Sequence, residues 1–455
     1  MVHVTPIVDE GLGNAAWLVD LGDGSALVVD PERDPRPYLA EADRQGLSFR
    51  LVVETHLHAD FVSGGRELVD TAGGGVGLLA PAAARLAYHH DPVIDGEEVA
   101  AGGLTLRVLA TPGHTPEHVS YLLVEGERPL ALFSGGTLIV GGVARPDLIA
   151  PHLDEPLARA AWRSITTRLL TLPDELPVYP THGGGSFCSA GSAERRSTTI
   201  GDERRENALL QAASEDAFVE GLLGGLGSYP PYFLRLREVN RRGPRRYGLV
   251  TPALSPLGIG AVDRLRAQGA ELIDVRRVAE FAAGHIPGAL SIELRDRFAT
   301  WLGWVVDDPA TPLVFVVDVE QDRDQLVRQC LNVGYEQLAG ELAGGVDAWR
   351  AAGRQVTTTE LLDEPRPASA VLDVRQTSEW EEGHVRGALH VELGSLARRA
   401  AEVPAGPVVA HCAHGQRSMT AASVLERAGR RDVAVFTGGP GEWTDPSGQR
   451  VAAGR

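Results

Sequence analysis

The C-terminal half of this chain contains an internal repeat, and the repeat constrains the fold more than any other feature. An Asp-Val-Arg run, a Gly-His-x-x-Gly-Ala turn and a Gly-Gly pair followed by Trp each occur twice, in the same order: Asp274–Arg276 and Asp373–Arg375, Gly284–Ala289 and Gly383–Ala388, Gly344–Trp349 and Gly438–Trp443. The first two pairs are 99 positions apart and the third is 94 positions apart. The chain is therefore predicted to hold two copies of one domain of about 100 residues, an ordinary domain size.

Both copies have the sequence pattern of an α/β domain. Leu272–Asp274 and Val371–Asp373 are short apolar strands. Leu313–Val317 and Val408–Ala410 are apolar without alternation, which is typical of strands buried on both faces of a parallel sheet. A helical stretch, Ser418–Ala428, follows the last of them. Strands that alternate with helices predict a parallel sheet with helices on its faces.

The repeats leave an N-terminal region that must fold separately. Two segments rich in turn-forming residues, 241–258 and 351–369, separate the parts of the chain. We therefore expect three domains, 1–250 with its linker, 251–355 and 356–455, in a chain too long for one ordinary core.

Charge and composition exclude several functions. With 43 basic and 61 acidic residues the formal charge is −18, the opposite of the cationic surface that nucleic-acid binding requires. No apolar run approaches the roughly 20 residues of a membrane span, and Asp9 and Glu10 follow the N-terminus without a basic, apolar leader. The three cysteines, Cys188, Cys330 and Cys412, are far apart and suit a reducing compartment. We expect a cytoplasmic protein with no membrane or nucleic-acid partner, and a homo-oligomer is left open.

Cys412 follows a predicted buried strand and precedes a predicted helix. The backbone N–H groups of such a loop and the helix dipole stabilise negative charge, and so favour a thiolate or a persulfide anion. Arg417 adds a permanent cation. The Cys-x4-Arg spacing makes a tight loop suited to one sulfur atom, whereas related phosphatases use one residue more. The alternative is a structural cysteine in a strand–helix turn.

Together with the repeated motifs, this loop resembles the active-site loop of the rhodanese family. The resemblance implies that Cys412 accepts a sulfane sulfur from a low-molecular-weight persulfide or thiosulfate and passes it to an acceptor thiol or cyanide. Catalysis would fall to Cys412 and to Arg417, which would help to hold an anionic donor. The persulfide loop would comprise Ala413, His414, Gly415, Gln416 and Ser418.

The first copy lacks this cysteine. The spacing of the last repeated motif places Asp318 opposite Cys412 and Arg323 opposite Arg417. Because an aspartate is not nucleophilic toward sulfane sulfur, we expect the first copy to be inactive and to act as a spacer or docking surface. Cys330 lies further along the following helix and is expected in the core.

The N-terminal region begins with a predicted β-hairpin and then presents histidines. Ala16–Asp20 and Ala26–Asp30 flank a Gly-Asp-Gly turn. The strand Leu51–Thr55 then leads to His56 and His58, at the strand end where α/β sheets place their sites.

Four motifs of this region follow the order and spacing of the metallo-β-lactamase fold: His56–Asp60, Pro112–Pro116, Phe133–Leu138 and Pro180–His182. Imidazoles two residues apart at a strand end, joined by a third from a distant loop, can converge on one cation. The resemblance implies an αββα sandwich, and hence a multidomain α/β protein whose last two domains are rhodanese-like.

Two positions depart from that family. Phe61 stands where the family usually has a histidine, and Gly136 where it usually has the aspartate ligand. The runs Gly141–Leu148 and Thr181–Cys188 resemble bacterial fusions of persulfide dioxygenase with two rhodanese domains. That resemblance covers essentially the whole chain and implies Fe(II) held by two histidines and one aspartate, of which the histidines correspond here to His56 and His114.

The expected metal is Fe(II) or Zn(II), and three possibilities remain for its ligands. His56, His58 and His114 form a three-histidine site, Asp60 supplies the carboxylate, or the domain holds no metal and only binds a persulfide. His182 is expected beside the site.

Cys188 lies in a loop rich in glycine and serine, near His182. It is either a second thiol that receives sulfur or an ordinary loop residue.

Three functions follow from these features. The leading hypothesis is an enzyme of sulfane-sulfur metabolism, with a rhodanese-type sulfurtransferase at Cys412 and an N-terminal domain that oxidises or binds a persulfide. The second is a metal-dependent thioester hydrolase of the hydroxyacylglutathione type. The third is a non-catalytic sulfur carrier or sensor.

Overall fold

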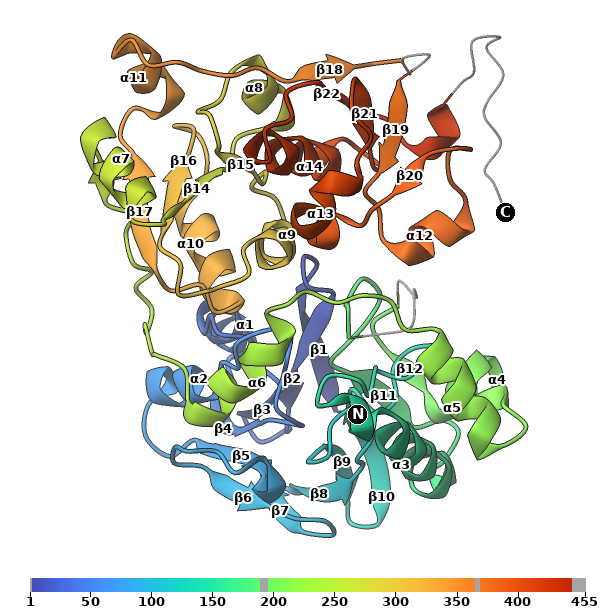
Figure 1. The fold of residues 1–455 in the computed structure, drawn as a ribbon. Coiled ribbons are helices and arrows are strands. Elements are labelled where there is room, and N and C mark those ends of the chain that lie inside the picture. The colour runs from blue at the N-terminus through green and yellow to red at the C-terminus, as the bar shows by residue number, and fades with distance from the viewer. Residues whose placement is uncertain (1, 189–194, 365–368, 444–455) are drawn as a thin grey trace. The chain divides into compact units, whose positions relative to one another are not determined.

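The computed structural model describes residues 2–188, 195–364 and 369–443, which divide into two units (Figure 1). One unit is Met1–Pro252 with Leu331–Gly334, and the other is Ala253–Cys330 with Tyr335–Arg455. The proposed third domain, 356–455, includes 365–368 and 444–455, which lie outside the described residues. None of the described helices combines the length and apolarity needed to cross a bilayer.

The N-terminal unit is the predicted αββα sandwich. Its two six-stranded sheets have the orders β1-β2-β3-β4-β5-β6 and β12-β11-β10-β9-β8-β7. The strands are β1 (His3–Asp9), β2 (Asn14–Asp20), β3 (Ser25–Val29), β4 (Ser48–Val53), β5 (Gly77–Pro81), β6 (Asp91–Val93), β7 (Glu98–Ala101), β8 (Leu104–Ala110), β9 (Val119–Glu125), β10 (Arg128–Gly135), β11 (Pro177–Pro180) and β12 (Thr198–Thr199). The helices are α1 (Arg36–Gln45), α2 (Gly65–Ala72), α3 (Asp154–Thr167), α4 (Ile200–Glu206), α5 (Glu215–Gly224) and α6 (Phe233–Arg242).

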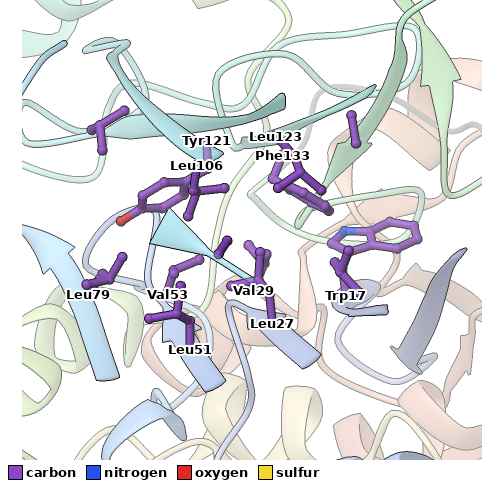
Figure 2. Close-up of a cluster of buried hydrophobic side chains, with 14 of the residues drawn as sticks. Trp17, Leu27, Val29, Leu51, Val53, Leu79, Leu106, Tyr121, Leu123 and Phe133 are labelled. Carbon is purple, nitrogen blue, oxygen red and sulfur yellow. The ribbon is translucent and has the colours of Figure 1, made fainter. Parts of the chain in front are cut away.

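The core of this unit lies between the two sheets (Figure 2). Trp17 and Leu27 come from the first sheet, and Tyr121 and Phe133 from the second. The predicted hairpin is confirmed, since β2 and β3 pair antiparallel. On the outer faces, apolar residues of α1 and α2 cover the first sheet, and those of α3 and α5 cover the second. Burial of both faces of each sheet fixes the strand ends that carry the histidines.

The second unit contains two five-stranded parallel sheets with the same strand order, β13-β17-β16-β14-β15 and β18-β22-β21-β19-β20. The strands are β13 (Pro256–Leu257), β14 (Glu271–Asp274), β15 (Leu290–Ser291), β16 (Leu313–Val316), β17 (Leu338–Leu342), β18 (Glu360–Leu362), β19 (Ala370–Asp373), β20 (Leu389–His390), β21 (Val408–His411) and β22 (Val433–Phe436). The helices are α7 (Ile259–Ala267), α8 (Val278–Ala283), α9 (Phe298–Val305), α10 (Arg323–Asn332), α11 (Gly345–Ala351), α12 (Thr377–Glu382), α13 (Leu393–Arg399) and α14 (Gln416–Arg427). The identical order confirms the predicted repeat.

An Asp–Arg clamp explains two of the repeated motifs. In the first copy Arg276 donates to both carboxylate oxygens of buried Asp274, at 2.9 and 2.6 Å, and to the carbonyl oxygen of Gly284 at 3.0 Å. In the second copy Arg375 binds Asp373 and the carbonyl of Gly383 in the same way. The clamp therefore ties the end of one strand to the Gly-His turn of its copy. A buried carboxylate and guanidinium are tolerated because each satisfies the other.

Helix α14 packs against both copies. Thr420 donates to the carbonyl oxygen of Ser291 at 2.6 Å, and the backbone N–H of Ser291 donates to Ser423 Oγ at 3.1 Å. At the other end of the helix, Glu426 lies 2.8 Å from His285 Nε2 and accepts from the N–H of Gly288 at 3.2 Å. The first copy thus holds the helix that follows Cys412.

Two short strands differ from the prediction. β13 and β18 fall inside the segments expected to be linkers, and each pairs in parallel at the edge of its sheet. Strands of two or three residues are too short for a hydrophobic period to appear in the sequence.

Two candidate sites: a histidine cluster and a cysteine loop

Three histidines converge in the N-terminal unit from the ends of three strands. His56 follows β4, His114 follows β8 and His182 follows β11. Their ligand nitrogens lie within 4.8 Å of one another, and each residue is at most 2% exposed. The structure therefore brings the predicted ligands His56 and His114 together with His182, and it places His58 and Asp60 within the same distance of His182 in a second group.

Hydrogen bonds turn the three rings so that their Nε2 atoms face each other. Each Nδ1 has an oxygen partner: His56 with Thr55 Oγ1 at 2.8 Å, His114 with the Arg145 carbonyl at 2.7 Å, and His182 with Asn14 Oδ1 at 3.0 Å. Because Nδ1 then carries the hydrogen, each Nε2 presents a lone pair.

These lone pairs fit a cation. His56 Nε2 and His182 Nε2 are 3.3 Å apart, and His114 Nε2 has no hydrogen-bond partner among the described residues. Burial lowers the pKa of both His56 and His114 well below the usual value, and the other histidines lower it further, so these rings are neutral. Neutral imidazoles that converge on one point are the donor set of Zn(II) and Fe(II) sites.

His58 lies beside this group, with its ring centroid 4.2 Å from that of His56, and it is paired with two carboxylates. Its Nε2 lies 3.2 Å from Asp30 Oδ1 and 3.3 Å from Glu54 Oε2. Burial alone would lower the pKa of His58, but the two carboxylates raise it to about 10. Phe61 stacks on the other side of the ring, with centroids 4.2 Å apart. His58 Nδ1 has no hydrogen-bond partner among the described residues, and His58 also belongs to two other groups that could hold a metal ion, one with Asp30 and His56 and one with Asp60 and His182.

Asp60 orients the cluster. Asn14 Nδ2 donates to its Oδ2 at 2.8 Å, and His182 Nδ1 lies 3.3 Å from the same oxygen. Burial opposes ionisation, but nearby His182 holds the pKa of Asp60 below its usual range. Asp60 therefore stays ionised and orients the ring of His182 through its Nδ1 atom, as carboxylates do for metal-binding histidines.

His118 was not predicted and takes the space beside Gly136. Its Nε2 accepts from the N–H of Gly136 at 3.0 Å, and its ring stacks on His56 at 4.9 Å. A Cβ on Gly136 would lie 2.5 Å from His114 Cδ2. The histidines thus fill the space that a carboxylate side chain at position 136 would need. The only sequence signal was the His-x-x-x-His spacing of His114 and His118.

Cys188 is fully buried. Burial raises the pKa of its thiol well above the usual value, and the charge of Asp60 raises it further. A thiol that keeps its proton is a poor nucleophile, which argues against Cys188 as a second sulfur acceptor.

The second site is the loop between β21 and α14. Cys412 follows the last residue of β21 and is 2% exposed, and its Sγ lies 3.6 Å from Ser418 Oγ. Gly415 has φ +88°, a left-handed conformation that favours glycine and lets the chain enter the helix. The first N–H groups of α14 have no acceptor within the helix, which favours an anion at this end. His414 of the same loop is exposed.

Arg417 already has an anionic partner. Its Nη1 and Nη2 donate to the two carboxylate oxygens of Glu379, the second at 2.8 Å. Trp301, from α9 of the first copy, lies over the guanidinium with its ring centroid 5.3 Å from Cζ. Burial would raise the pKa of Glu379, but Arg417 lowers it, so the pair stays ionised.

The first copy has no cysteine in the matching loop. Asp274 pairs with Val316, and Asp373 pairs with His411. This register places Val317 at the position of Cys412, so Asp318 lies one residue further along than its sequence spacing predicts. The loop that leads to Arg323 is one residue longer than the loop that leads to Arg417.

Comparison with known families agrees with this architecture. The metallo-beta-lactamase superfamily matches residues 9–182, and the rhodanese-like domain matches residues 260–352 and 357–446. A hydroxyacylglutathione hydrolase from Methylobacillus flagellatus is 40% identical over 229 residues, 50% of this chain and 84% of that protein. The chain belongs to the metallo-beta-lactamase superfamily and carries two rhodanese-like domains.

Two further proteins are similar to this chain, one over the metallo-beta-lactamase domain and one over a longer part of the chain. Human "Persulfide dioxygenase ETHE1, mitochondrial" is 27% identical over 215 residues, 47% of this chain and 77% of that protein. The crystal structure of a metallo-beta-lactamase from Staphylococcus aureus has a TM-score of 0.66 at 26% identity, and the match covers 75% of this chain and 99% of that one. The second of these matches extends beyond the N-terminal domain alone.

Proposed function

We propose that this protein is a sulfurtransferase of sulfane-sulfur metabolism that carries sulfur as a persulfide on Cys412. The observation that carries the proposal is the place of Cys412, between a buried strand and the N-terminus of α14, in a segment that matches the rhodanese-like domain. The first rhodanese-like domain, with Val317 in the corresponding position, is proposed to be inactive.

The transfer is a pair of displacements at sulfur. The Cys412 thiolate attacks the sulfane sulfur of thiosulfate, an S–S bond forms to Cys412, and sulfite leaves with the electrons of the broken bond. With a low-molecular-weight persulfide, the corresponding thiolate leaves instead. Cyanide or an acceptor thiolate then attacks the outer sulfur and returns Cys412 as a thiolate. The N-terminus of α14 stabilises the anion in both states.

The test is the formation of thiocyanate from thiosulfate and cyanide by the full-length protein. Cys412→Ser should lower the rate by at least about 10³-fold, because it removes the nucleophile. Cys188→Ser is the matched control and should retain the activity. Mass spectrometry after donor treatment should show a gain of about 32 Da, one sulfur atom, on Cys412. Full activity of Cys412→Ser would refute the proposal.

We also propose that the N-terminal domain binds one metal ion through His56, His114 and His182. The convergence of three Nε2 lone pairs favours this ligand set. A bound Fe(II) would supply the redox chemistry that oxidation of a persulfide by O₂ requires. The chain's own residues fix the ligand tautomers through Thr55 and Asn14.

Metal content tests this ligand set without an activity assay. The protein as purified, or after anaerobic reconstitution with Fe(II), should hold about one metal ion per chain, and His114→Ala should lower this occupancy at least about tenfold. His152→Ala changes an exposed histidine and should leave the occupancy unchanged. A wild-type chain that takes up neither iron nor zinc would refute the site.

The hydrolase alternative rests on the relatives with that name and predicts turnover of a hydroxyacylglutathione by the metal-loaded protein. A hydrolase with two metals needs a second set of ligands, which Gly136 and Phe61 do not supply. The carrier alternative predicts a stable persulfide on Cys412 that no small acceptor removes.

A further inference from the structure

The first rhodanese-like domain presents side chains to the Cys412 site. α9 contacts α13 of the second domain, and Trp301 of α9 covers Arg417, the last residue of the Cys-x4-Arg loop. A Cβ on Gly394 of α13 would lie 2.0 Å from Trp304 Cε3, so the two helices are in close contact. Arg295 lies at the turn that leads into α9, where its carbonyl oxygen accepts from the N–H of Phe298. Arg295 and Trp301 therefore belong to one short segment beside the sulfur loop.

Arg417 alone is a weak candidate for binding an anionic donor. Both of its terminal nitrogens donate to Glu379, whose carboxylate cancels the charge of the guanidinium. An incoming sulfonate or carboxylate would have to compete with that carboxylate for the same hydrogen bonds. Beside the N–H groups at the start of α14, a side chain other than Arg417 is therefore needed to supply an uncompensated positive charge.

Arg295 and Trp301 have donors that remain unused. Arg295 forms no ion pair in the parts of the chain that the structure describes, although it is half-buried. Burial lowers the pKa of its guanidinium, the charge of Glu293 opposes this shift, and the charges of Arg297, Arg417 and Cys412 also act on it, so Arg295 is within electrostatic range of the Cys412 loop. A guanidinium stays protonated even so. Trp301 is 6% exposed, and its Nε1–H has no acceptor among the described residues. A buried donor without an acceptor is unfavourable unless a ligand satisfies it.

We propose that Arg295 and the indole N–H of Trp301, both from the catalytically inactive first domain, bind the anionic group of the sulfur donor opposite Cys412. This inference rests on the proposed sulfurtransferase function. The donor class is a small sulfane-sulfur compound with an anionic group, either the sulfonate of thiosulfate or the carboxylate of a thiol persulfide such as glutathione persulfide. The donor's sulfane sulfur then faces Cys412 while its charge lies against the first domain.

Steady-state kinetics of the full-length protein test the inference with donors of different charge. Arg295→Gln should raise the KM for thiosulfate by about 10- to 100-fold, as expected for loss of a charged hydrogen bond. Trp301→Phe, which keeps the ring, should raise it by a smaller factor, about 3- to 10-fold. Mercaptoethanol persulfide carries no carboxylate or sulfonate, so the KM for this donor should change by less than about twofold. Arg350→Gln removes one exposed positive charge from the same domain and is the matched control.

Glutathione persulfide separates the two sources of the anion. An increase in KM for thiosulfate alone assigns the site to a sulfonate next to the sulfane sulfur. An increase for both donors assigns it to anionic donors in general. An unchanged KM for thiosulfate in Arg295→Gln, or an equal increase with mercaptoethanol persulfide, would overturn the inference.

Binding to an inactive variant keeps this test independent of sulfur transfer. Isothermal titration of thiosulfate into Cys412→Ser should give a Kd that Arg295→Gln raises by about tenfold or more. If the wild-type protein transfers sulfur from no donor but this difference is found, the sulfurtransferase proposal fails and the anion site remains. Equal affinities in the two variants would refute the anion site.

Discussion

At the scale of single residues, one hydrogen bond per imidazole orients the three histidines of the proposed metal site. His56, His114 and His182 each use Nδ1 for an oxygen partner and leave Nε2 free. His58, two residues from His56, is instead held by two carboxylates. Two histidines that are close in the sequence therefore have different partners, and the orientation of each ring is the basis of the proposed ligand set.

Asp318 of the first rhodanese-like domain gives a residue-scale prediction. Burial, and then the neighbouring carboxyl group of Glu280, raise the pKa of Asp318 to about 6, compared with about 3.9 in an unfolded chain. A raised pKa means that the stabilisation is complete below the unfolded value and is lost as the pH rises through the folded value. Asp318→Asn cannot ionise, so it should raise Tm more at pH 7.5 than at pH 4.5.

The size of this effect is limited because Asp318 is partly exposed and its charge is screened. We expect a difference of less than about 1 kcal/mol in unfolding free energy between the two pH values. Asp347→Asn, at a 95% exposed side chain of α11, is the control. A larger increase in Tm for Asp318→Asn at pH 4.5 than at pH 7.5 would contradict the raised pKa of Asp318.

At the scale of elements, α14 joins the two rhodanese-like domains. Its N-terminus lies at the Cys412 loop, and its C-terminal turn holds Glu426 against His285 and Gly288 of the first domain. The first rhodanese-like domain therefore holds the helix that begins at the Cys412 loop, which gives this domain a physical role in positioning the site.

The contact of Glu426 predicts a loss of stability on substitution. Glu426→Gln removes the charge from a hydrogen bond to a fully buried imidazole and should lower the free energy of unfolding by about 1–3 kcal/mol. Urea denaturation of the full chain measures this change. Glu402→Gln removes a carboxylate from an exposed pair with Arg399 and should change it by less than about 0.5 kcal/mol. Equal effects of the two substitutions would show that α14 is not held at this point.

At the scale of the whole molecule, the sequence predicted the αββα sandwich, the repeat and the parallel sheets. Long strands and repeated motifs produce clear sequence patterns. The antiparallel pairing of β2 with β3 confirms the predicted hairpin, and the identical strand order of the two five-stranded sheets confirms the predicted repeat. The rest depended on contacts between distant parts of the chain. The approach of Asp30 to His58, and of Trp301 to Arg417, joins residues from different strands or different copies. The spacing of hydrophobic residues along the sequence does not indicate such contacts.

The cysteine loop shows the same limit on a smaller scale. The alignment by spacing placed Asp318 opposite Cys412, but the strand register places Val317 there. A single extra residue in a loop shifts the alignment of the two copies by one position, and the motifs on either side of the loop do not show where the extra residue lies. The register of a sheet is set by backbone pairing, which a single sequence does not display.

The Asp–Arg clamp has a consequence for how the two rhodanese-like domains could diverge. It joins a strand end to a turn in each copy, through Asp274 and Arg276 in one and Asp373 and Arg375 in the other, and it includes no residue of the sulfur loop. The residues that stabilise the fold and the residues that carry the chemistry thus lie in separate segments of the sequence. After a duplication, substitutions in the sulfur loop of one copy would therefore remove its chemistry and leave the clamp, and with it the fold of that copy, intact.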